Sequence, residues 1–158
     1  MTSLLYLGVE GILFSNHPST PPLRHQFDKL PAQGLLVPVI ITALREHPDV
    51  SIVLNSWWVA DYGYRTTFSL LPDEIACKTI GATMPGNRKH RYAADVRTRV
   101  DILRSDIARR NPPRVTIVDA IRSAIPFEYG PRAVAVTSRL FTNIDGFLSE
   151  LRRLLNTD

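Results

Sequence analysis

The sequence predicts an α/β fold, a three-layer α/β/α sandwich around a mainly parallel sheet, with one domain over residues 1–158 and no separate cap domain. Three observations support this prediction. Short apolar runs alternate with segments of helical periodicity, which is typical of βαβ units. The apolar runs are nearly continuous, as in strands buried on both faces. A composition of 44% hydrophobic and 22% charged residues is that of a globular chain able to bury a core.

Four apolar runs predict strands, and a fifth run predicts a shorter one. The runs are LLYL (4–7), VSIVLN (50–55), RVTIVD (114–119), RAVAVT (132–137) and the shorter CKTIGAT (77–83). Right-handed crossovers between such strands give an open parallel sheet with helices on both faces. The carboxyl ends of the strands then share one edge, where ligands bind in folds of this kind.

Helical periodicity or helix-start and helix-stop signals predict the helices between these strands. The predicted segments are 36–48, 64–72, 72–78, 91–113 and 142–156. In the long helix of residues 91–113, four apolar residues fall on one face, namely Val96, Val100, Leu103 and Ile107. Residues 15–35 are rich in proline and polar residues, which predicts an irregular loop or a small lid. This loop and segment 57–76 are too short for a large cap.

Several chemically active residues follow the predicted strands at the carboxyl edge. The first strand leads to Gly8 and Glu10, the second to Asn55 and Ser56, and the RVTIVD strand ends at Asp119. The long helix before that last strand contributes Arg97 and Arg99. Because these residues converge on one edge of the sheet, the sequence predicts the functional site there.

The order and spacing of these segments resemble the four motifs of the haloacid dehalogenase-like (HAD-like) superfamily of phosphohydrolases. YLGVEGILF resembles the first motif, SIVLNSWW the second in the form seen in small bacterial members, and VTIVDA the fourth. Arg99 has the spacing of the basic residue of the third motif, with Arg97 as its rival. The resemblance covers nearly the whole chain and implies a HAD-type sheet, a phosphate ligand and a magnesium ion.

The first motif departs from the family pattern. Gly8 stands where the family has the aspartate that attacks phosphorus and binds magnesium, and glycine can do neither. Glu10 stands at the general acid and base, one methylene longer than the usual aspartate. Ala120 stands where a second acid often follows Asp119. The resemblance therefore implies at most a weak Mg²⁺ site, formed by Asp119 and Glu10.

Two functional hypotheses follow, and they leave open whether the chain is an enzyme. The first is a HAD-like protein that lacks the aspartate nucleophile, is catalytically impaired, and binds a phosphorylated small molecule, a protein or a nucleic acid. The alternative is an active Mg²⁺-dependent phosphohydrolase in which Glu10 and Asp119 activate water.

A plainer hypothesis is a structural subunit in an oligomer. Only one of the adjacent residues Trp57 and Trp58 is expected to face the core, so the other is available for a pocket or an interface.

Ordinary structural roles compete with the functional ones at these positions. Gly8 would also suit a close approach of backbones at a strand end. Asn55 and Ser56 would cap a helix that starts near Trp57, and the same helix end would favour an anion. Asp119 would also suit a turn cap.

Segment 88–114 is basic but contains acidic residues at helical spacing. Pairs such as Asp95–Arg99 and Asp106–Arg110 predict a solvated helix face. A nucleic-acid contact surface is the second interpretation, and the net charge of +4 permits it without requiring it.

The expected location is the cytoplasm. The single cysteine, Cys77, excludes an internal disulfide, and the start of the chain lacks the pattern of a secretory signal. No apolar stretch approaches the roughly 18–20 residues that span a bilayer, so no membrane contact is expected. The four histidines lack the spacing of a zinc site.

Overall fold

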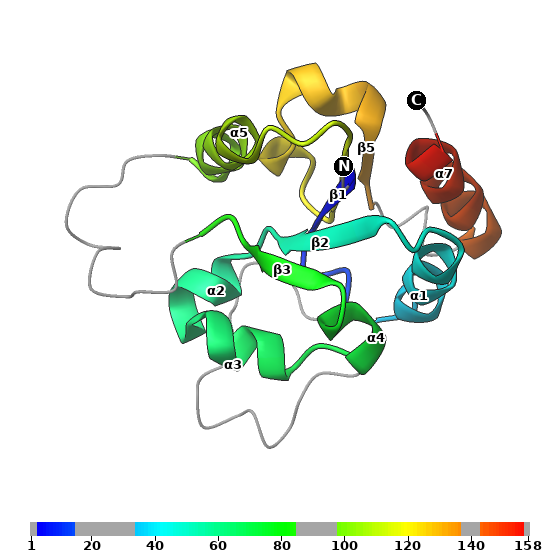
Figure 1. Cartoon of the computed structure of the whole chain (residues 1–158), viewed down its shortest axis with the longest axis horizontal. Coiled ribbons are helices and arrows are strands. Elements are labelled where there is room, and N and C mark those ends of the chain that lie inside the picture. The colour runs from blue at the N-terminus through cyan, green and yellow to red at the C-terminus, as the bar shows by residue number, and fades with distance from the viewer. Residues whose placement is uncertain (1–2, 15–33, 85–97, 137–142, 157–158) are drawn as a thin grey trace.

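Five parallel strands form one sheet in the computed structural model, which describes residues 3–14, 34–84, 98–136 and 143–156 (Figure 1). The strands are β1 (Ser3–Leu7), β2 (Val50–Leu54), β3 (Thr79–Ala82), β4 (Val115–Asp119) and β5 (Ala133–Ala135). Their order in the sheet is β3-β2-β1-β4-β5. The prediction of a parallel sheet is confirmed. Strands β2 to β5 lie inside their predicted runs, and β1 begins one residue before its run.

The register of the central strands brings the predicted site residues together. Leu7 at the end of β1 pairs with Leu54 of β2 and with Val118 of β4. The ladder continues one step beyond β1, because the Gly8 N–H donates to the Val118 carbonyl and the Asn55 N–H donates to the Leu7 carbonyl. The chain segments carrying Gly8, Asn55 and Asp119 therefore lie side by side at the carboxyl edge.

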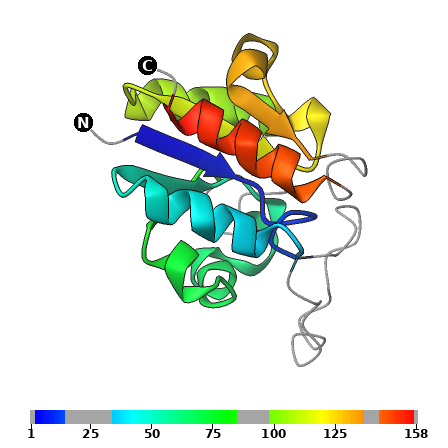
Figure 2. The ribbon, with the colours of Figure 1, turned by 90° about the vertical axis from the view of Figure 1, so that its right-hand side faces the viewer.

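Two helical layers cover the two faces of the sheet. Leu5 and Leu7 of β1 belong to the core cluster that also contains buried residues of α1 (Val37–Glu46) and α7 (Ile144–Asn156). Both helices run along the same face of β1 (Figure 2). Leu4 and Tyr6 point to the opposite face, into a second cluster with α5 (Arg99–Arg110). The two 3-10 helices, η3 (Arg122–Ala124) and η4 (Phe127–Arg132), follow β4. The three-layer prediction is confirmed.

Three short helices fill segment 57–76, which was too short for a large cap. They are α2 (Trp57–Tyr62), α3 (Tyr64–Ser69) and α4 (Asp73–Ala76). Trp58 and Ile75 are buried in the same core cluster as Leu5 and Leu7 of β1. The segment therefore packs on the hydrophobic core and does not form a lid. No separate cap domain is present among the described residues, and none of the helices described there is long and apolar enough to cross a membrane.

The expectation that one of the two tryptophans is exposed is wrong. Trp58 is buried and stacks on Phe14, with ring centroids 5.2 Å apart, while Trp57 is half-buried and packs against the same core. Adjacent helical positions are only about 100° apart, so two large side chains can both reach the core from a short helix lying close to it.

The long helix predicted over residues 91–113 is shorter than expected. Helix α5 begins at Arg99, because Thr98 has an extended backbone and forms a capping box with Asp101. It ends at Arg110, where Asn111 adopts the left-handed conformation that commonly terminates helices. Leu103 and Ile107 occupy the buried stripe as predicted, whereas Val100 is only half-buried and Val96 lies outside the described residues.

Replacement of Thr98 with alanine is expected to lower the free energy of unfolding by about 1 kcal/mol, because the Asp101 N–H loses its side-chain acceptor. Thr98→Ser keeps a hydroxyl at the same position and should retain most of the stability. Urea denaturation of the three proteins measures the difference. Equal midpoints for Thr98→Ala and the parent chain would contradict the assignment of the cap.

Candidate functional site at the carboxyl edge

The turn after β1 places Glu10 at the carboxyl edge of the sheet. The N–H of Leu13 donates to the Val9 carbonyl at 3.0 Å, which closes the turn, and Gly11 has a φ of 73°. A Cβ atom at Gly11 would lie 2.9 Å from the Cβ of Ala120. Glycine is therefore required both by the backbone conformation and by the close approach of Ala120. Glu10, in the same turn, is only 4% exposed.

The Glu10 carboxylate is held by a backbone donor and by one distant cation. Its Oε1 accepts a hydrogen bond from the Trp58 N–H at 3.2 Å. The same N–H lies 3.1 Å from the Oγ of Ser56, which caps α2 as the sequence predicted. The Oε2 of Glu10 has no hydrogen-bond donor and lies 3.9 Å from the Nη2 of Arg99. One carboxylate oxygen is therefore satisfied and the other has only an electrostatic partner.

Asp119 has partners on both carboxylate oxygens. Its Oδ1 accepts a hydrogen bond from the Ile121 N–H at 2.9 Å, which is the turn cap anticipated from the sequence. Its Oδ2 accepts from the Nη2 of Arg99 at 2.6 Å and from the Nδ2 of Asn55 at 3.2 Å. Asp119 is only 1% exposed, and these three donors provide hydrogen bonds to both of its oxygens.

Arg99 enters this site from the first residue of α5 and is 6% exposed. Besides Asp119, its Nη2 donates to the backbone carbonyl of Asn55, and its Nε has no acceptor. We refer to Glu10, Asn55, Arg99 and Asp119 as the carboxyl-edge cluster. Its central feature is one buried guanidinium placed between two buried carboxylates.

Thr83 supports the cluster and was not anticipated from the sequence. Its hydroxyl donates to the Oδ1 of Asn55 at 3.0 Å, which directs the Asn55 amide nitrogen toward Asp119. A signal was available, because Thr83 follows β3 as Asn55 follows β2, and a hydroxyl at that edge would meet the site.

Burial is the largest influence on the pKa of Asp119. Burial raises the pKa of Asp119 to about 6, while Arg99 and the Ile121 N–H act in the opposite direction. The Glu10 carboxylate raises the pKa of Asp119 further, and the Asn55 amide lowers it. Two carboxylates share one guanidinium, so full ionisation leaves an excess negative charge in a buried site.

Gly8 lies directly against Asp119. A Cβ atom at Gly8 would be 3.3 Å from the Oδ2 of Asp119 and 3.4 Å from its Cγ. Any side chain at position 8 therefore requires Asp119 to shift by a few tenths of an ångström. The Asp119 carboxylate therefore occupies the space beside Gly8 at the carboxyl edge.

The cluster does not fit a magnesium ion. Magnesium needs several oxygen ligands in near-octahedral geometry and usually relies on carboxylates. Asp119 already has donors on both oxygens, which leaves the Glu10 Oε2, and the Arg99 guanidinium lies 3.9 Å from that atom. Elsewhere in the described parts of the chain, no three acidic, histidine or cysteine side chains gather closely enough to hold a metal ion.

A second buried polar group lies on the other face of the sheet. The Tyr6 hydroxyl donates to the Oδ2 of Asp106 at 3.2 Å, and Arg110 Nε donates to the same oxygen at 2.7 Å. Arg109 pairs with the other carboxylate oxygen. The predicted Asp106–Arg110 pair is confirmed, but its solvated placement is wrong, because Asp106 is only 5% exposed. Burial, followed by the Asp106 charge, raises the pKa of Tyr6 well above its usual range.

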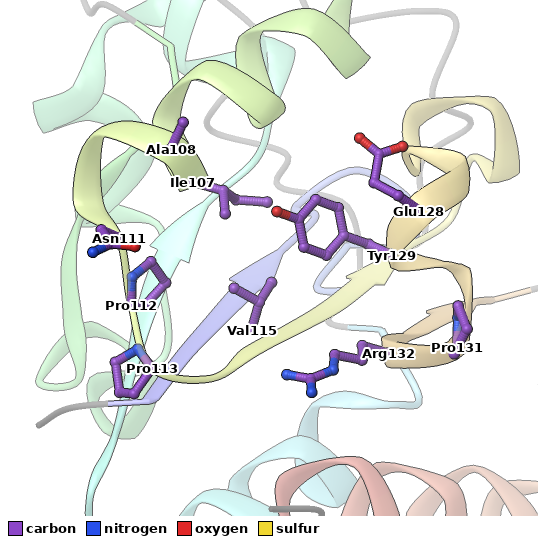
Figure 3. A pocket seen from close by; sticks show the side chains of 10 residues that line it. All are labelled: Ile107, Ala108, Asn111, Pro112, Pro113, Val115, Glu128, Tyr129, Pro131 and Arg132. Atoms are coloured by element: carbon purple, nitrogen blue, oxygen red, sulfur yellow. The ribbon is translucent and has the colours of Figure 1, made fainter.

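A hollow of about 370 Å³ lies at the opposite end of α5 from Arg99 (Figure 3). Tyr129 extends across it from η4 toward Ile107, and prolines and Arg132 form its rim. Because the hollow adjoins Val115 at the start of β4, it is separated from Asp119 by the length of that strand. No residue of the predicted site lines it.

Parts of the predicted site and surface lie outside the described residues. They are Arg97, most of the loop 15–35, and the first part of the basic segment, including Asp95 of the predicted Asp95–Arg99 pair. In the described part of that segment, each arginine forms an ion pair with a carboxylate. These arginines are Arg99, Arg104, Arg109, Arg110 and Arg114. The pairing is typical of a solvated or partly buried helix face.

Side chains from several of the segments that carried the predicted site meet at this edge. Glu10, Arg99 and Asp119 come from three of the motif segments, and Ser56 shares the Trp58 N–H with Glu10. Comparison of the chain with protein-family models, with curated proteins and with solved structures found no match.

Proposed function

We propose that this chain is a HAD-like protein that no longer transfers phosphoryl groups and acts by binding a partner. The observation that carries the proposal is the state of position 8. Glycine offers no nucleophile there, and a Cβ atom at Gly8 would make a tight contact of 3.3 Å with the Asp119 carboxylate. Covalent transfer through an enzyme aspartate requires such a nucleophile.

The groups that would hold a phosphate are engaged by side chains of the chain itself. The Glu10 carboxylate accepts the Trp58 N–H and lies beside Arg99, so it takes the place of an external anion. Arg99 in turn donates to Asp119 and to the Asn55 carbonyl. A phosphate would have to displace Glu10 from the Trp58 N–H and from its place beside the Arg99 guanidinium. This competition favours a macromolecular partner over a phosphorylated small molecule.

Exposed apolar surface supports a role in binding. Phe127 is 94% exposed on η4 and borders a hollow of about 590 Å³ with Ile125, Pro126 and Pro131. Aromatic side chains are enriched at protein contact surfaces, and this one lies beside an apolar hollow that could receive part of a partner. The hollow lies beside β5, on the sheet edge opposite β3.

Phosphatase activity against a panel of phosphoesters with Mg²⁺ tests the proposal. We expect the parent chain and Asp119→Ala to show the same background rate. The Gly8→Asp/Glu10→Asp double variant restores both family aspartates but keeps the Arg99 guanidinium against Asp119. Its rate is therefore also expected to stay near the background, because the position for the magnesium ion of the family reaction is still taken. Circular dichroism would verify that each variant is folded.

One observation favours an active enzyme as the second candidate. The Oε2 of Glu10 is buried and has no hydrogen-bond donor, as a general base awaiting a proton would be. An active phosphohydrolase would use Glu10 and Asp119 to activate water. Activity of the parent chain that disappears in both Asp119→Ala and Glu10→Gln would establish this candidate and overturn the proposed loss of catalysis.

A further inference from the structure

We infer that the Arg99 guanidinium occupies the cation position between Glu10 and Asp119, so that the chain excludes a divalent cation there, and that removal of its charge uncovers a divalent-cation site. The inference deepens the proposed function at the same site. It rests on that function, because phosphoryl transfer through magnesium would need the position that Arg99 takes.

The geometry places the guanidinium where a cation would bridge the two carboxylates. Its Nη2 lies 2.6 Å from the Oδ2 of Asp119 and 3.9 Å from the Oε2 of Glu10. The same nitrogen donates to the backbone carbonyl of Asn55, an oxygen that could also ligate a metal ion. One atom of Arg99 therefore faces three oxygens that come from three different strand ends.

The Arg99 side chain is fixed in this position by the fold. It is 6% exposed and projects from the first residue of α5, whose start is set by the Thr98 capping box. Asn55 adds a second donor to Asp119, and Thr83 holds the Asn55 amide in the orientation that makes this possible. A divalent ion entering the site would meet the positive guanidinium within a few ångströms in a buried environment, where charge repulsion is strong.

Removal of the positive charge changes the balance. Without the guanidinium, Asp119 Oδ2, Glu10 Oε2 and the Asn55 carbonyl lose their shared cation. Two buried carboxylates without a cation are unfavourable, so a small divalent ion becomes the favoured counter-charge. Arg99→Gln suits this test, because its amide can still donate to one of these oxygens but carries no charge.

Titration with Mn²⁺ followed by electron paramagnetic resonance measures the binding without any substrate. In the parent chain, we expect no saturable binding through Asp119 up to about 1 mM Mn²⁺, the range of weak biological divalent sites. Arg99→Gln is expected to bind one Mn²⁺ with an affinity at least about tenfold higher than the parent. The added change Asp119→Asn should abolish this gain.

Arg104→Gln is the matched control. Arg104 lies on the same helix and pairs with Glu128 at the surface, away from the carboxyl-edge cluster. Its replacement removes one guanidinium from α5 and should leave Mn²⁺ binding unchanged, so a gain confined to Arg99→Gln supports the inference.

Two results would overturn the inference. One is saturable Mn²⁺ binding by the parent chain that is lost in Asp119→Asn, and the other is a folded Arg99→Gln variant that binds no Mn²⁺. If Arg99→Gln does not fold, the comparison of the parent chain with Asp119→Asn decides alone. Failure of the proposed function appears separately, as turnover of phosphoesters by the parent chain.

Discussion

Replacement of Arg99 with leucine is expected to lower the free energy of unfolding by about 3–5 kcal/mol at pH 7. The guanidinium is the shared cation of two buried carboxylates, Glu10 and Asp119. Breaking a buried ion pair by removing one partner leaves an uncompensated buried charge, and the expected loss is typical of that situation. Leucine also leaves Asp119 with fewer hydrogen-bond donors.

The loss should depend on pH in a defined direction. Burial already raises the pKa of Asp119 to about 6 in the parent chain, and Arg99 is the main group that opposes the rise. A carboxyl whose pKa is higher in the folded state binds its proton more tightly when folded. Its destabilising effect is therefore absent below the unfolded pKa of about 4 and complete above the folded pKa. In Arg99→Leu, stability should fall as pH rises from about 4 through 6 and beyond, more steeply than in the parent chain.

Urea denaturation of the parent chain, Arg99→Leu and Arg104→Leu at several pH values between 4 and 8 measures both effects. Arg104 forms an exposed pair with Glu128 on the same helix, and such pairs contribute little to stability. Equal losses for the two variants at pH 7, or a loss in Arg99→Leu that grows toward acid pH, would contradict the ion-cluster interpretation.

Replacement of Asp106 with alanine is expected to lower the free energy of unfolding by about 3 kcal/mol. The Tyr6 hydroxyl is fully buried on β1 and has Asp106 as its acceptor, so alanine leaves a buried donor unsatisfied. Arg110 loses the same carboxylate and is mostly buried beside β3. Ser105→Ala, on the exposed side of the same helix turn, should change stability by no more than about 0.5 kcal/mol.

A double-mutant cycle separates the Tyr6 contact from the rest of the loss. Tyr6→Phe alone is expected to cost about 1 kcal/mol, because it removes the hydroxyl and leaves Asp106 with its two arginines. In Tyr6→Phe/Asp106→Ala the orphaned hydroxyl is absent, so the combined loss should be smaller than the sum by about 1 kcal/mol. Strict additivity, measured by urea denaturation, would show that the buried hydrogen bond contributes nothing.

Local patterns were sufficient to predict the sheet. The runs that became β1, β2 and β4 place apolar residues on both faces, with Ser3, Ser51 and Thr116 as the exceptions before the final residue, a pattern that suits central parallel strands. The capping role of Ser56 and the Asp106–Arg110 pair were also predictable, because both involve residues two to four positions apart. The start of α5 was not predicted correctly, since the apolar spacing that predicted the helix includes Val96, while the capping box of Thr98 starts the helix at Arg99.

The candidate site was only partly predictable. Strand order and spacing place Gly8, Glu10, Asn55 and Asp119 at one edge, and the spacing of Arg99 from Asp119 favoured it over Arg97 as the partner. The hydrogen bond from Thr83 to Asn55 was not predicted, although the place of Thr83 after β3 was a signal for it, and the burial of Tyr6 with Asp106 was not predicted either. These contacts join residues 28 and 100 positions apart. Such pairs depend on side-chain directions that periodicity does not encode.

The sequence by itself determined the α/β class, the parallel strands and the absence of an aspartate at position 8, because these depend on local composition and on single residues. Only the tertiary structure decided which groups surround Asp119 and Glu10. It places the Arg99 guanidinium against Asp119, and the Glu10 carboxylate accepts a hydrogen bond from the Trp58 N–H. The charged groups of the cluster therefore find their partners within the chain itself. The physical reason is burial: once water is excluded, each carboxylate must find a donor or a cation within reach, and the fold alone determines which groups are within reach.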